Sequence, residues 1–416
     1  MQTSRSKRAT AALCRSMGLS IAIHALLSVA RAQAAPPIAA LAIEQSQYAS
    51  LRGSEARRQI VVTGRDAKGG AHDLTHKVTY ESQPQGIVNV DATGLVTPLA
   101  DGKATVTART QDGVAGTLEV TVESFSNPAP VSFPNQIVPI FTKHSCNSGG
   151  CHGKSSGQNG FKLSLLGFYP EEDHEYLVKE GRGRRILAAA PEQSLLLQKA
   201  TNAVPHGGGQ RIEPESYEYR LLRRWMLQGM PYGSPNDPRV VRLEVVPDAR
   251  TMVQNDEQQL SVFAHYSDSS VEDVTRMAQY EANDREMAEV TPAGVVKTHD
   301  LAGEVAVMVR FQGQVGVFRG TVPLGAPMQT LPPKRNFIDE LVFKKLELLG
   351  VPPSAVSDDS TFLRRVTYDV AGRSPTLEES KGFLADKDPA KRDKFIERLL
   401  ASTDYADYFA NKWSAV

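Results

Sequence analysis

The chain has 416 residues, and its 47 lysines and arginines balance 47 aspartates and glutamates. The length predicts several domains rather than a single core. The balanced charge argues against a protein that binds nucleic acid or another polyanion, because such binding needs a basic surface.

The first 34 residues are typical of an export signal. Basic residues near the start precede an apolar run over 17–30, and small residues follow at a spacing suited to cleavage near Ala32 or Ala34. The apolar run is too short to predict a membrane span. We therefore expect 1–34 to be removed as a signal peptide, with no transmembrane span in the mature chain. Loss of the first 32 residues leaves 42 basic against 47 acidic residues, which disfavours nucleic acid further.

Residues 36–125 are expected to form an all-β domain. Short β-branched runs in this region are separated by Gly, Asp and Pro turns: 59–63, 77–80, 87–90 and 104–108. Strands at such spacing are typical of a β-sandwich. The same pattern returns 200 residues later, so 238–325 is expected to be a second copy of the same domain.

Matching positions in the two copies carry a resemblance. The segment 72–75 corresponds to 272–275, and Gly94 corresponds to Gly294. Both copies resemble the group 2 bacterial immunoglobulin-like domain, whose usual roles are adhesion and spacing, so the resemblance implies no chemistry. We expect Asp73 and its counterpart Asp273 to start turns or cap strands rather than to bind an ion.

The stretch 143–154 contains the residues best suited to chemistry. Cys146 and Cys151 are followed at once by His152. Thioether bonds from two cysteines can fix a haem, and a histidine directly after the second cysteine falls beneath the iron. The usual attachment motif has two residues between the cysteines, whereas this one has four. The extra pair is assigned to Gly149 and Gly150, which can adopt the tight or positive-φ turn that a longer loop needs.

Two other uses of these residues remain open. Once a signal peptide that includes Cys14 is removed, Cys146 and Cys151 are the cysteines that remain, and they can close a small loop as a disulfide. A zinc site is the other alternative, although it would need a fourth ligand and more usually has cysteine pairs at short spacing.

The rest of 131–234 is expected to be helical. Pro191 is suited to the first turn of a helix. A clearer helix is expected over 214–228, ended by Gly229 as a C-terminal cap. Four apolar residues fall on one face of that helix: Leu221, Leu222, Trp225 and Met226.

Four blocks of this region together carry a closer resemblance: 146–154, 157–165, 205–209 and 221–225. They are similar to the planctomycete-type cytochrome c domain, in the branch that occurs with immunoglobulin-like repeats. The resemblance implies one covalent haem c attached through Cys146 and Cys151, with His152 as an axial ligand. The chain departs from the common family pattern in its cysteine spacing and in having 205–209 where a Met-Pro-Pro segment usually stands.

The sixth iron ligand is predicted to be His206, because it lies in the segment that replaces the family's methionine. Met230, just beyond the terminal helix, is the main rival, and an unliganded surface loop is the other alternative. Met226 is expected to lie in the core, and His144 is too near the attachment loop to reach the far side of the ring.

The C-terminal residues 336–416 are expected to be helical and to follow a proline-rich linker. One helix is expected over 337–349, ended by Gly350, and a capping box begins at Thr376. A further helix should open at Asp388 and reach Leu400.

The segment 363–375 is similar to the start of a domain of unknown function that accompanies these cytochrome domains. That family implies a longer C-terminal half, so we expect a truncated domain. Arg364, Arg365 and Asp369 are expected to form a buried ion-pair network rather than a catalytic set.

These patterns predict a multidomain α+β protein, with two immunoglobulin-like β-sandwiches flanking a small all-α cytochrome c-like domain and a helical C-terminal segment. Each sandwich has roughly 85 residues and is expected to fold alone. The predicted function is an exported c-type haem protein, in the periplasm or at the cell surface. It would transfer electrons with an unidentified redox partner, by itself or within a larger redox enzyme. The alternative is a cell-surface structural or adhesion protein with a Cys146–Cys151 disulfide and no haem.

Overall fold

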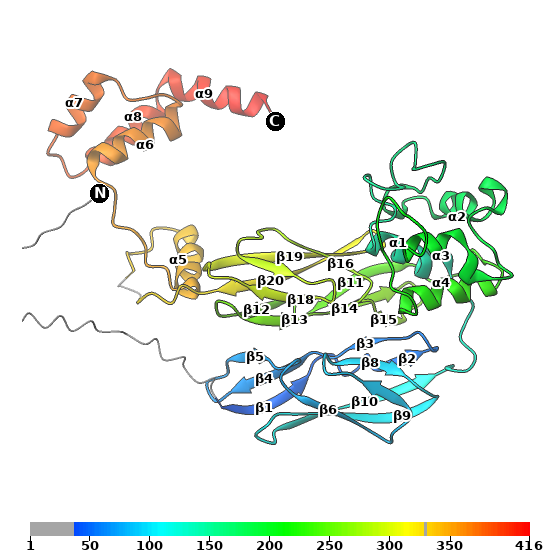
Figure 1. Ribbon diagram of the computed structural model, residues 1–416. Helices are drawn as coiled ribbons and strands as arrows, with labels where there is room; N and C mark the ends of the chain where they lie inside the picture. The colour runs from blue at the N-terminus through cyan, green and yellow to red at the C-terminus, as the bar shows by residue number, and fades with distance from the viewer. Residues whose placement is uncertain (1–36, 328–330) are drawn as a thin grey trace, which may run out of the picture.

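The computed structural model describes residues 37–327 and 331–416. The predicted signal peptide, 1–34, lies outside the described residues. The described chain is a mixed α+β structure with two β modules, a helical unit and a helical C-terminal bundle (Figure 1). Within the two described ranges, no helix is both long enough and apolar enough to cross a membrane.

The first β module is built from short strands. Its strands are β1 (Ile38–Ile43), β2 (Ser50–Arg52), β3 (Arg58–Gln59), β4 (Val62–Asp66), β5 (Ala71–Asp73), β6 (Thr79–Gln83), β7 (Val88–Val90), β8 (Leu95–Pro98), β9 (Gly102–Arg109) and β10 (Ala115–Glu123). They form sheets of order β1-β4-β5, β2-β10-β9-β6 and β3-β8-β7. Side chains of β9 and β10 alternate between buried and accessible positions, as a strand with one face on a core requires.

The second β module repeats this arrangement. Its strands are β11 (Val240–Val246), β12 (Ala249–Thr251), β13 (Glu257–Gln259), β14 (Ser261–Tyr266), β15 (Val271–Asp273), β16 (Gln279–Ala282), β17 (Ala288–Val290), β18 (Val295–Thr298), β19 (Gly303–Phe311) and β20 (Gln314–Val322). The sheet orders β11-β14-β15, β12-β20-β19-β16 and β13-β18-β17 match those of the first module strand for strand. The repeat in the sequence is therefore also a repeat in topology.

The two β modules pack directly against each other through equivalent residues. The backbone N–H of Gln59 donates to Oδ2 of Asp273 at 2.7 Å, and the backbone N–H of Gln259 donates to Oδ2 of Asp73. In both aspartates Oδ1 accepts from the N–H of the threonine two residues on, at 2.8 and 2.9 Å. The prediction that these aspartates start turns is confirmed, but each also bridges to the other module. The two bonds satisfy backbone donors of the strands β3 and β13, which end their sheets.

The helical unit between the modules in sequence has short helices and long loops. Its helices are η1 (Phe133–Ile137), α1 (Val138–Lys143), η2 (Leu165–Gly167), α2 (Pro170–Val178), η3 (Glu180–Gly183), η4 (Pro191–Gln193), α3 (Leu195–Ala200) and α4 (Tyr217–Leu227). The helix predicted over 214–228 is α4, which starts later because the Ser216 side chain accepts from the N–H of Tyr219 as an N-cap. Its predicted apolar face is buried.

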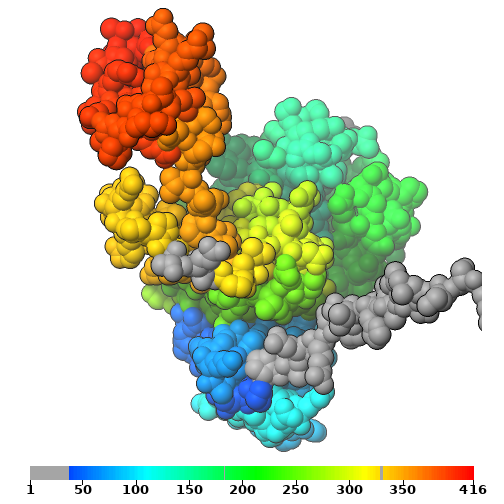
Figure 2. Space-filling model, turned by 90° about the vertical axis from the view of Figure 1, so that its left-hand side faces the viewer, coloured from blue at the N-terminus to red at the C-terminus, as the bar shows by residue number. Residues whose placement is uncertain are grey.

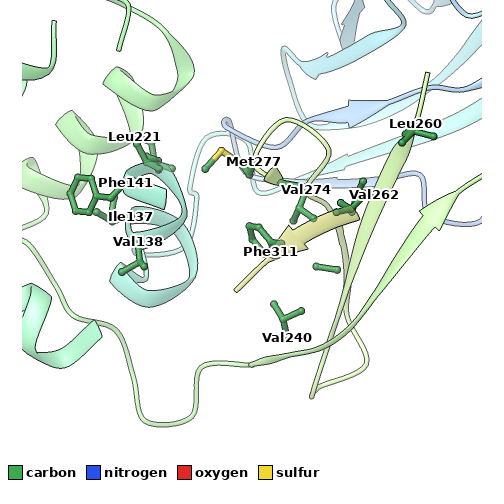
Figure 3. Packing of buried hydrophobic residues seen from close by; sticks show 14 of the residues in the cluster. Ile137, Val138, Phe141, Leu221, Val240, Leu260, Val262, Val274, Met277 and Phe311 are labelled. Atoms are coloured by element: carbon green, nitrogen blue, oxygen red, sulfur yellow. The ribbon is translucent and has the colours of Figure 1, made fainter. Parts of the chain in front are cut away.

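The helical unit and the second β module share one hydrophobic core. Ile137, Phe141 and Leu221 of the helical unit belong to the same buried cluster as Met277 and Phe311 of the second module (Figure 3). The first module has a separate core. A separate core is consistent with the prediction that the first module folds alone. A fragment with only the second module would instead expose part of the shared core.

The helical unit lies at one end of the paired β modules, so the modules flank it in sequence but not in space (Figure 1). It also touches the first module. Arg224 of α4 pairs with Glu55 at 3.1 Å, and the Arg57 guanidinium lies 3.4 Å from the centre of the Tyr217 ring. The three units thus form one packed body rather than a string of separated spacers.

The C-terminal residues divide into one helix near the second module and a separate bundle (Figures 1 and 2). Helix α5 (Phe337–Leu349) ends at Gly350 in the left-handed conformation, as predicted, and the N–H of Leu324 donates to the carbonyl of Leu349 at 2.7 Å. The bundle consists of α6 (Asp359–Ala371), α7 (Leu377–Ala385), α8 (Lys391–Leu400) and α9 (Thr403–Ser414). Thr376 forms the predicted capping box. Helix α8 begins after Asp388, whose carboxylate accepts from the N–H of Ala390 at 2.8 Å in the preceding turn.

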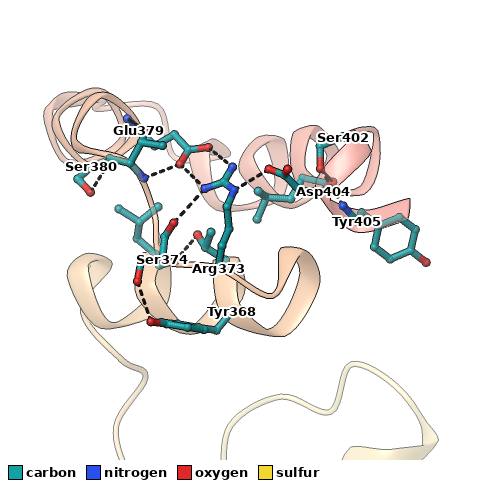
Figure 4. Close-up of polar contacts among 12 residues, drawn as sticks. Tyr368, Arg373, Ser374, Glu379, Ser380, Ser402, Asp404 and Tyr405 are labelled. Atoms are coloured by element: carbon teal, nitrogen blue, oxygen red, sulfur yellow. Dashed lines mark hydrogen bonds and ion pairs between the residues drawn. The ribbon is translucent and has the colours of Figure 1, made fainter. Parts of the chain in front are cut away.

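The predicted buried ion-pair network is wrong. Arg364, Arg365 and Asp369 are exposed, because the buried face of α6 consists of Leu363, Thr367 and Ala371, four residues apart. The ion pairs come instead from Arg373, which bonds to Glu379 at 2.9 Å and to Asp404 at 2.6 Å and so ties α7 and α9 to the end of α6 (Figure 4).

Candidate functional site

The predicted attachment residues lie on a compact loop after α1. The N–H of His152 donates to the carbonyl of Cys146 at 2.9 Å, and the N–H of Cys151 donates to the carbonyl of Ser148 at 3.0 Å. The carbonyl of His152 accepts from the N–H of Leu163, a fully buried residue, at 2.9 Å. Backbone bonds therefore hold Cys146, Cys151 and His152 together and anchor the end of the loop to the core.

The glycines in this loop act differently from the prediction. Neither Gly149 nor Gly150 adopts a positive φ, and a Cβ at Gly150 would meet open space. The crowded position is Gly153, where a Cβ would overlap the carbonyl of Asn147 and lie 2.9 Å from the carbonyl oxygen of Ser148. The turn tightens after the second cysteine, because the N–H of Gly153 also donates to Ser148 at 3.0 Å.

This crowding gives a test of the loop geometry. Gly153→Ala is expected to lower the free energy of unfolding by about 1–3 kcal/mol, because backbone atoms rather than a flexible side chain block the new methyl group. Gly150→Ala is the matched control and should leave stability unchanged. Urea denaturation followed by circular dichroism measures both. Equal stabilities for the two variants would contradict the loop packing described here.

His152 and His206 lie close together with parallel rings. Their ring centres are 6.4 Å apart and their planes differ by 7°. Nδ1 of His152 is 3.0 Å from the carbonyl oxygen of Phe161, and Nδ1 of His206 is 2.8 Å from that of Gly209. A carbonyl can only accept, so both Nδ1 atoms donate, and a neutral imidazole that donates through Nδ1 has its lone pair on Nε2. Burial lowers the pKa of His152, which favours its neutral form.

The other candidate ligands have different surroundings. The carbonyl of Met230 accepts from Nε2 of His174 at 2.9 Å, and its side chain packs against the shared core. Met226 is fully buried and its sulfur lies 3.3 Å from the Ser194 hydroxyl, so its predicted place in the core is confirmed. Nε2 of His144 is buried without a hydrogen-bond partner.

Three residues near the site received no role from the sequence. The Phe161 ring lies 4.5 Å from the His152 ring, and the Arg185 guanidinium lies 4.7 Å from the centre of the Phe161 ring. Arg211 approaches Sγ of Cys151 at 4.0 Å. Burial raises the pKa of the Cys146 thiol to about 11, and the charge of Arg211 opposes this rise. The one sequence signal for Arg211 is its place just after the glycine-rich segment that contains His206.

Both cysteines are free thiols and half-buried. Across 37–327 and 331–416, no group of three or more His, Cys, Asp or Glu side chains could hold a metal ion. A cavity of about 1380 Å³ opens between the helical unit and the second β module. Its lining includes Gly153 and Leu163 but none of the residues Cys146, Cys151, His152 and His206.

Two parts of the chain match known families. Residues 54–122 match the bacterial Ig-like domain (group 2), and residues 337–416 match PSCyt2, a protein of unknown function (DUF1549). Neither match covers the helical unit. No curated protein matches the chain.

The solved structures that match the chain include an S-layer protein, a cadherin and an adhesin. The S-layer protein rSbsC is 10% identical with a TM-score of 0.19, over 71% of this chain and 29% of that chain. Drosophila N-cadherin EC1-4 is 10% identical with a TM-score of 0.16, over 68% and 49% of the two chains. The Yersinia pseudotuberculosis adhesin InvE is 12% identical with a TM-score of 0.15, over 69% and 59%. The chain thus spans less than a third of the S-layer chain's length.

Proposed function

We propose that the protein is an exported c-type haem protein. Its helical unit would bind one haem through thioether bonds to Cys146 and Cys151, with His152 and His206 as the axial ligands. The observation that carries this proposal is the pair of parallel imidazoles with centres 6.4 Å apart. Two imidazoles that bind opposite sides of one metal through bonds of about 2.0–2.1 Å have ring centres roughly 6 Å apart.

The hydrogen bonds of the two histidines support the same proposal. Metal-binding histidines almost always donate their second ring N–H to a carboxylate, a backbone carbonyl or a water, which sets the tautomer and the ring orientation. His152 and His206 both do this through Nδ1. Among the described residues the two cysteines do not form a metal-binding group with these imidazoles, and two imidazoles alone make an incomplete site for zinc, which takes four ligands. A porphyrin supplies four nitrogens of its own, so two protein ligands complete a haem site.

The proposed role is electron transfer with a redox partner protein. The haem supplies one-electron chemistry when bound, and the protein sets its potential through the axial ligands, burial and hydrogen bonds. Ligation by His152 and His206 would give a lower potential than ligation by histidine and methionine. Export agrees with this role, because the sequence predicts a signal peptide and thioether attachment takes place outside the cytoplasm.

The test is the haem content of protein made with a haem-attachment system. We expect the wild type to gain the mass of one haem, to resist acid-acetone extraction and to give a pyridine haemochrome spectrum. Cys146→Ser or Cys151→Ser alone should keep one thioether bond, and the double variant should carry no covalent haem. A wild type without haem, or a double variant that retains covalent haem, would overturn the proposal.

A second candidate function is a cell-surface structural or adhesion protein without haem. The observation that favours it is the direct packing of two immunoglobulin-like modules through Asp73 and Asp273, which would make a stiff structural element. Mass spectrometry and the absorption spectrum of the exported protein separate the two candidates. Linked Cys146 and Cys151 together with no Soret band would favour the structural role, although both cysteines are free thiols in the structure.

A further inference from the structure

The two proposed axial ligands are held very differently, and the inference drawn from this difference rests on the proposed function. His152 is fixed from several directions. Its N–H and its carbonyl bond to Cys146 and Leu163, both at 2.9 Å, and its ring is oriented by Phe161, which lies nine residues away in the sequence. To move its ring, the attachment loop would have to separate from the buried core at Leu163.

His206 belongs to a loop that is bonded mainly to itself. Its ring is oriented by the carbonyl of Gly209, and the N–H of Gly209 donates back to the carbonyl of His206 at 2.9 Å. The loop is tied to α3 by the Lys199 amine, which donates to the carbonyl of Pro205, and after the loop the N–H of Arg211 donates to the carbonyl of Ala200 at 2.7 Å. The bonds that orient the His206 ring can therefore move with the loop.

The glycines of this loop allow such a movement. A Cβ at Gly207 or at Gly209 would meet open space, and Gly209 has a φ of +69°. Pro205 and Gly207 are exposed. A loop with few contacts opens at a small free-energy cost, because little apolar surface and few hydrogen bonds are lost when it moves.

We propose that His206 is a displaceable ligand and that its movement opens a binding position, opposite His152, for a small neutral diatomic molecule such as carbon monoxide or nitric oxide. His152 stays in place and keeps the haem anchored while the loop 205–209 swings away. The site would then both transfer electrons and bind a diatomic ligand. Binding would depend on the opening of the loop, because the ligand and the His206 imidazole compete for one position.

The test uses the full-length protein with haem attached, reduced and mixed with carbon monoxide under anaerobic conditions. The wild type should form the carbon monoxide complex slowly, at a rate that stops rising at high ligand concentration because loop opening becomes limiting. His206→Ala should bind at least about tenfold faster and should change the spectrum of the unligated protein from low to high spin.

Gly207→Ala tests the loop without removing the ligand. An alanine there reduces the freedom of the open loop and should slow binding by about two- to fivefold. Gly382→Ala, also a change into open space but in α7 of the C-terminal bundle, is the matched control and should bind carbon monoxide at the wild-type rate. A fully loaded wild type that never binds carbon monoxide would overturn the inference and leave the proposed function intact. Wild type and His206→Ala with the same fast rate would also overturn it, whereas protein without haem would overturn the proposed function.

Discussion

Trp225→Ala is expected to lower the free energy of unfolding by about 3–5 kcal/mol, the range for removing a large aromatic side chain from a core. Trp225 is completely buried in α4. Its ring centre lies 5.4 Å from that of Phe133, and its indole N–H donates to the carbonyl of Pro231 at 2.8 Å. The variant would leave a cavity in the helical unit and an unsatisfied carbonyl at its edge.

The effect should extend beyond the helical unit. Because the helical unit and the second β module share one core, we expect the β-sheet signal of the second module to unfold at the same lowered denaturant concentration. Leu227→Ala on the same helix is the matched control, because Leu227 is 55% exposed, and its effect should stay within about 0.5 kcal/mol. Hydrogen exchange read by mass spectrometry during urea denaturation follows the helical unit and the second β module separately in both variants. A second module that keeps its wild-type stability in Trp225→Ala while the helical unit unfolds earlier would contradict a shared core.

Asp273→Ala is expected to destabilise the protein by about 2–4 kcal/mol and to weaken the contact between the two β modules. Oδ1 accepts from the N–H of Thr275 and Oδ2 from the N–H of Gln59, so the variant leaves two backbone donors without their partner. Each unsatisfied buried group costs about 1–3 kcal/mol. Asp273→Asn should be nearly as harmful. Both carboxylate oxygens of Asp273 accept from a backbone N–H, and in asparagine the NH2 group that replaces one oxygen would face such an N–H without accepting from it.

The matched control is Asp91→Ala in the first module. Asp91 caps a local turn by accepting from the N–H of Thr93 at 2.8 Å and of Leu95 at 3.1 Å, and it is exposed. Its loss should therefore cost less than the loss of Asp273. A double-mutant cycle between Asp73 and Asp273 should show non-additive effects, since either substitution already weakens the same interface. Full additivity, or equal costs for Asp91→Ala and Asp273→Ala, would argue that the bridges contribute little.

The sequence alone predicted the features that depend on residues a few positions apart. The buried face of α4, the cap at Gly350 and the capping box at Thr376 follow from helical period and from side chains within one turn of the backbone groups they satisfy. Alternating strands and turn residues predicted the β modules, and the repeat at 200 residues predicted their common topology. The motif residues Cys146, Cys151 and His152 were also evident, because they lie within seven residues of one another.

Other expectations were wrong because they inferred how a residue packs in the fold from the few residues beside it in the sequence. Gly149 and Gly150 looked necessary for the loop, but the crowding falls at Gly153, where the chain folds back on Asn147. Arg364 was expected to join a buried ion-pair network, but the buried face of α6 consists of Leu363, Thr367 and Ala371. A residue's type does not show which side of its element meets the rest of the fold.

The tertiary structure decided what depends on segments that are distant in sequence. The bond between Gln59 and Asp273 joins residues 214 positions apart. The core shared by the helical unit and the second β module joins two segments that the sequence predicted to be separate domains. The approach of His152 and His206 is of the same kind. The sequence could offer His206 as a ligand, but its distance from His152 depends on how α3, α4 and the attachment loop pack together. Local hydrogen bonds and the periodic spacing of apolar side chains depend on neighbouring residues, so the sequence predicts them. The contacts between distant segments form only after burial of apolar surface has brought those segments together.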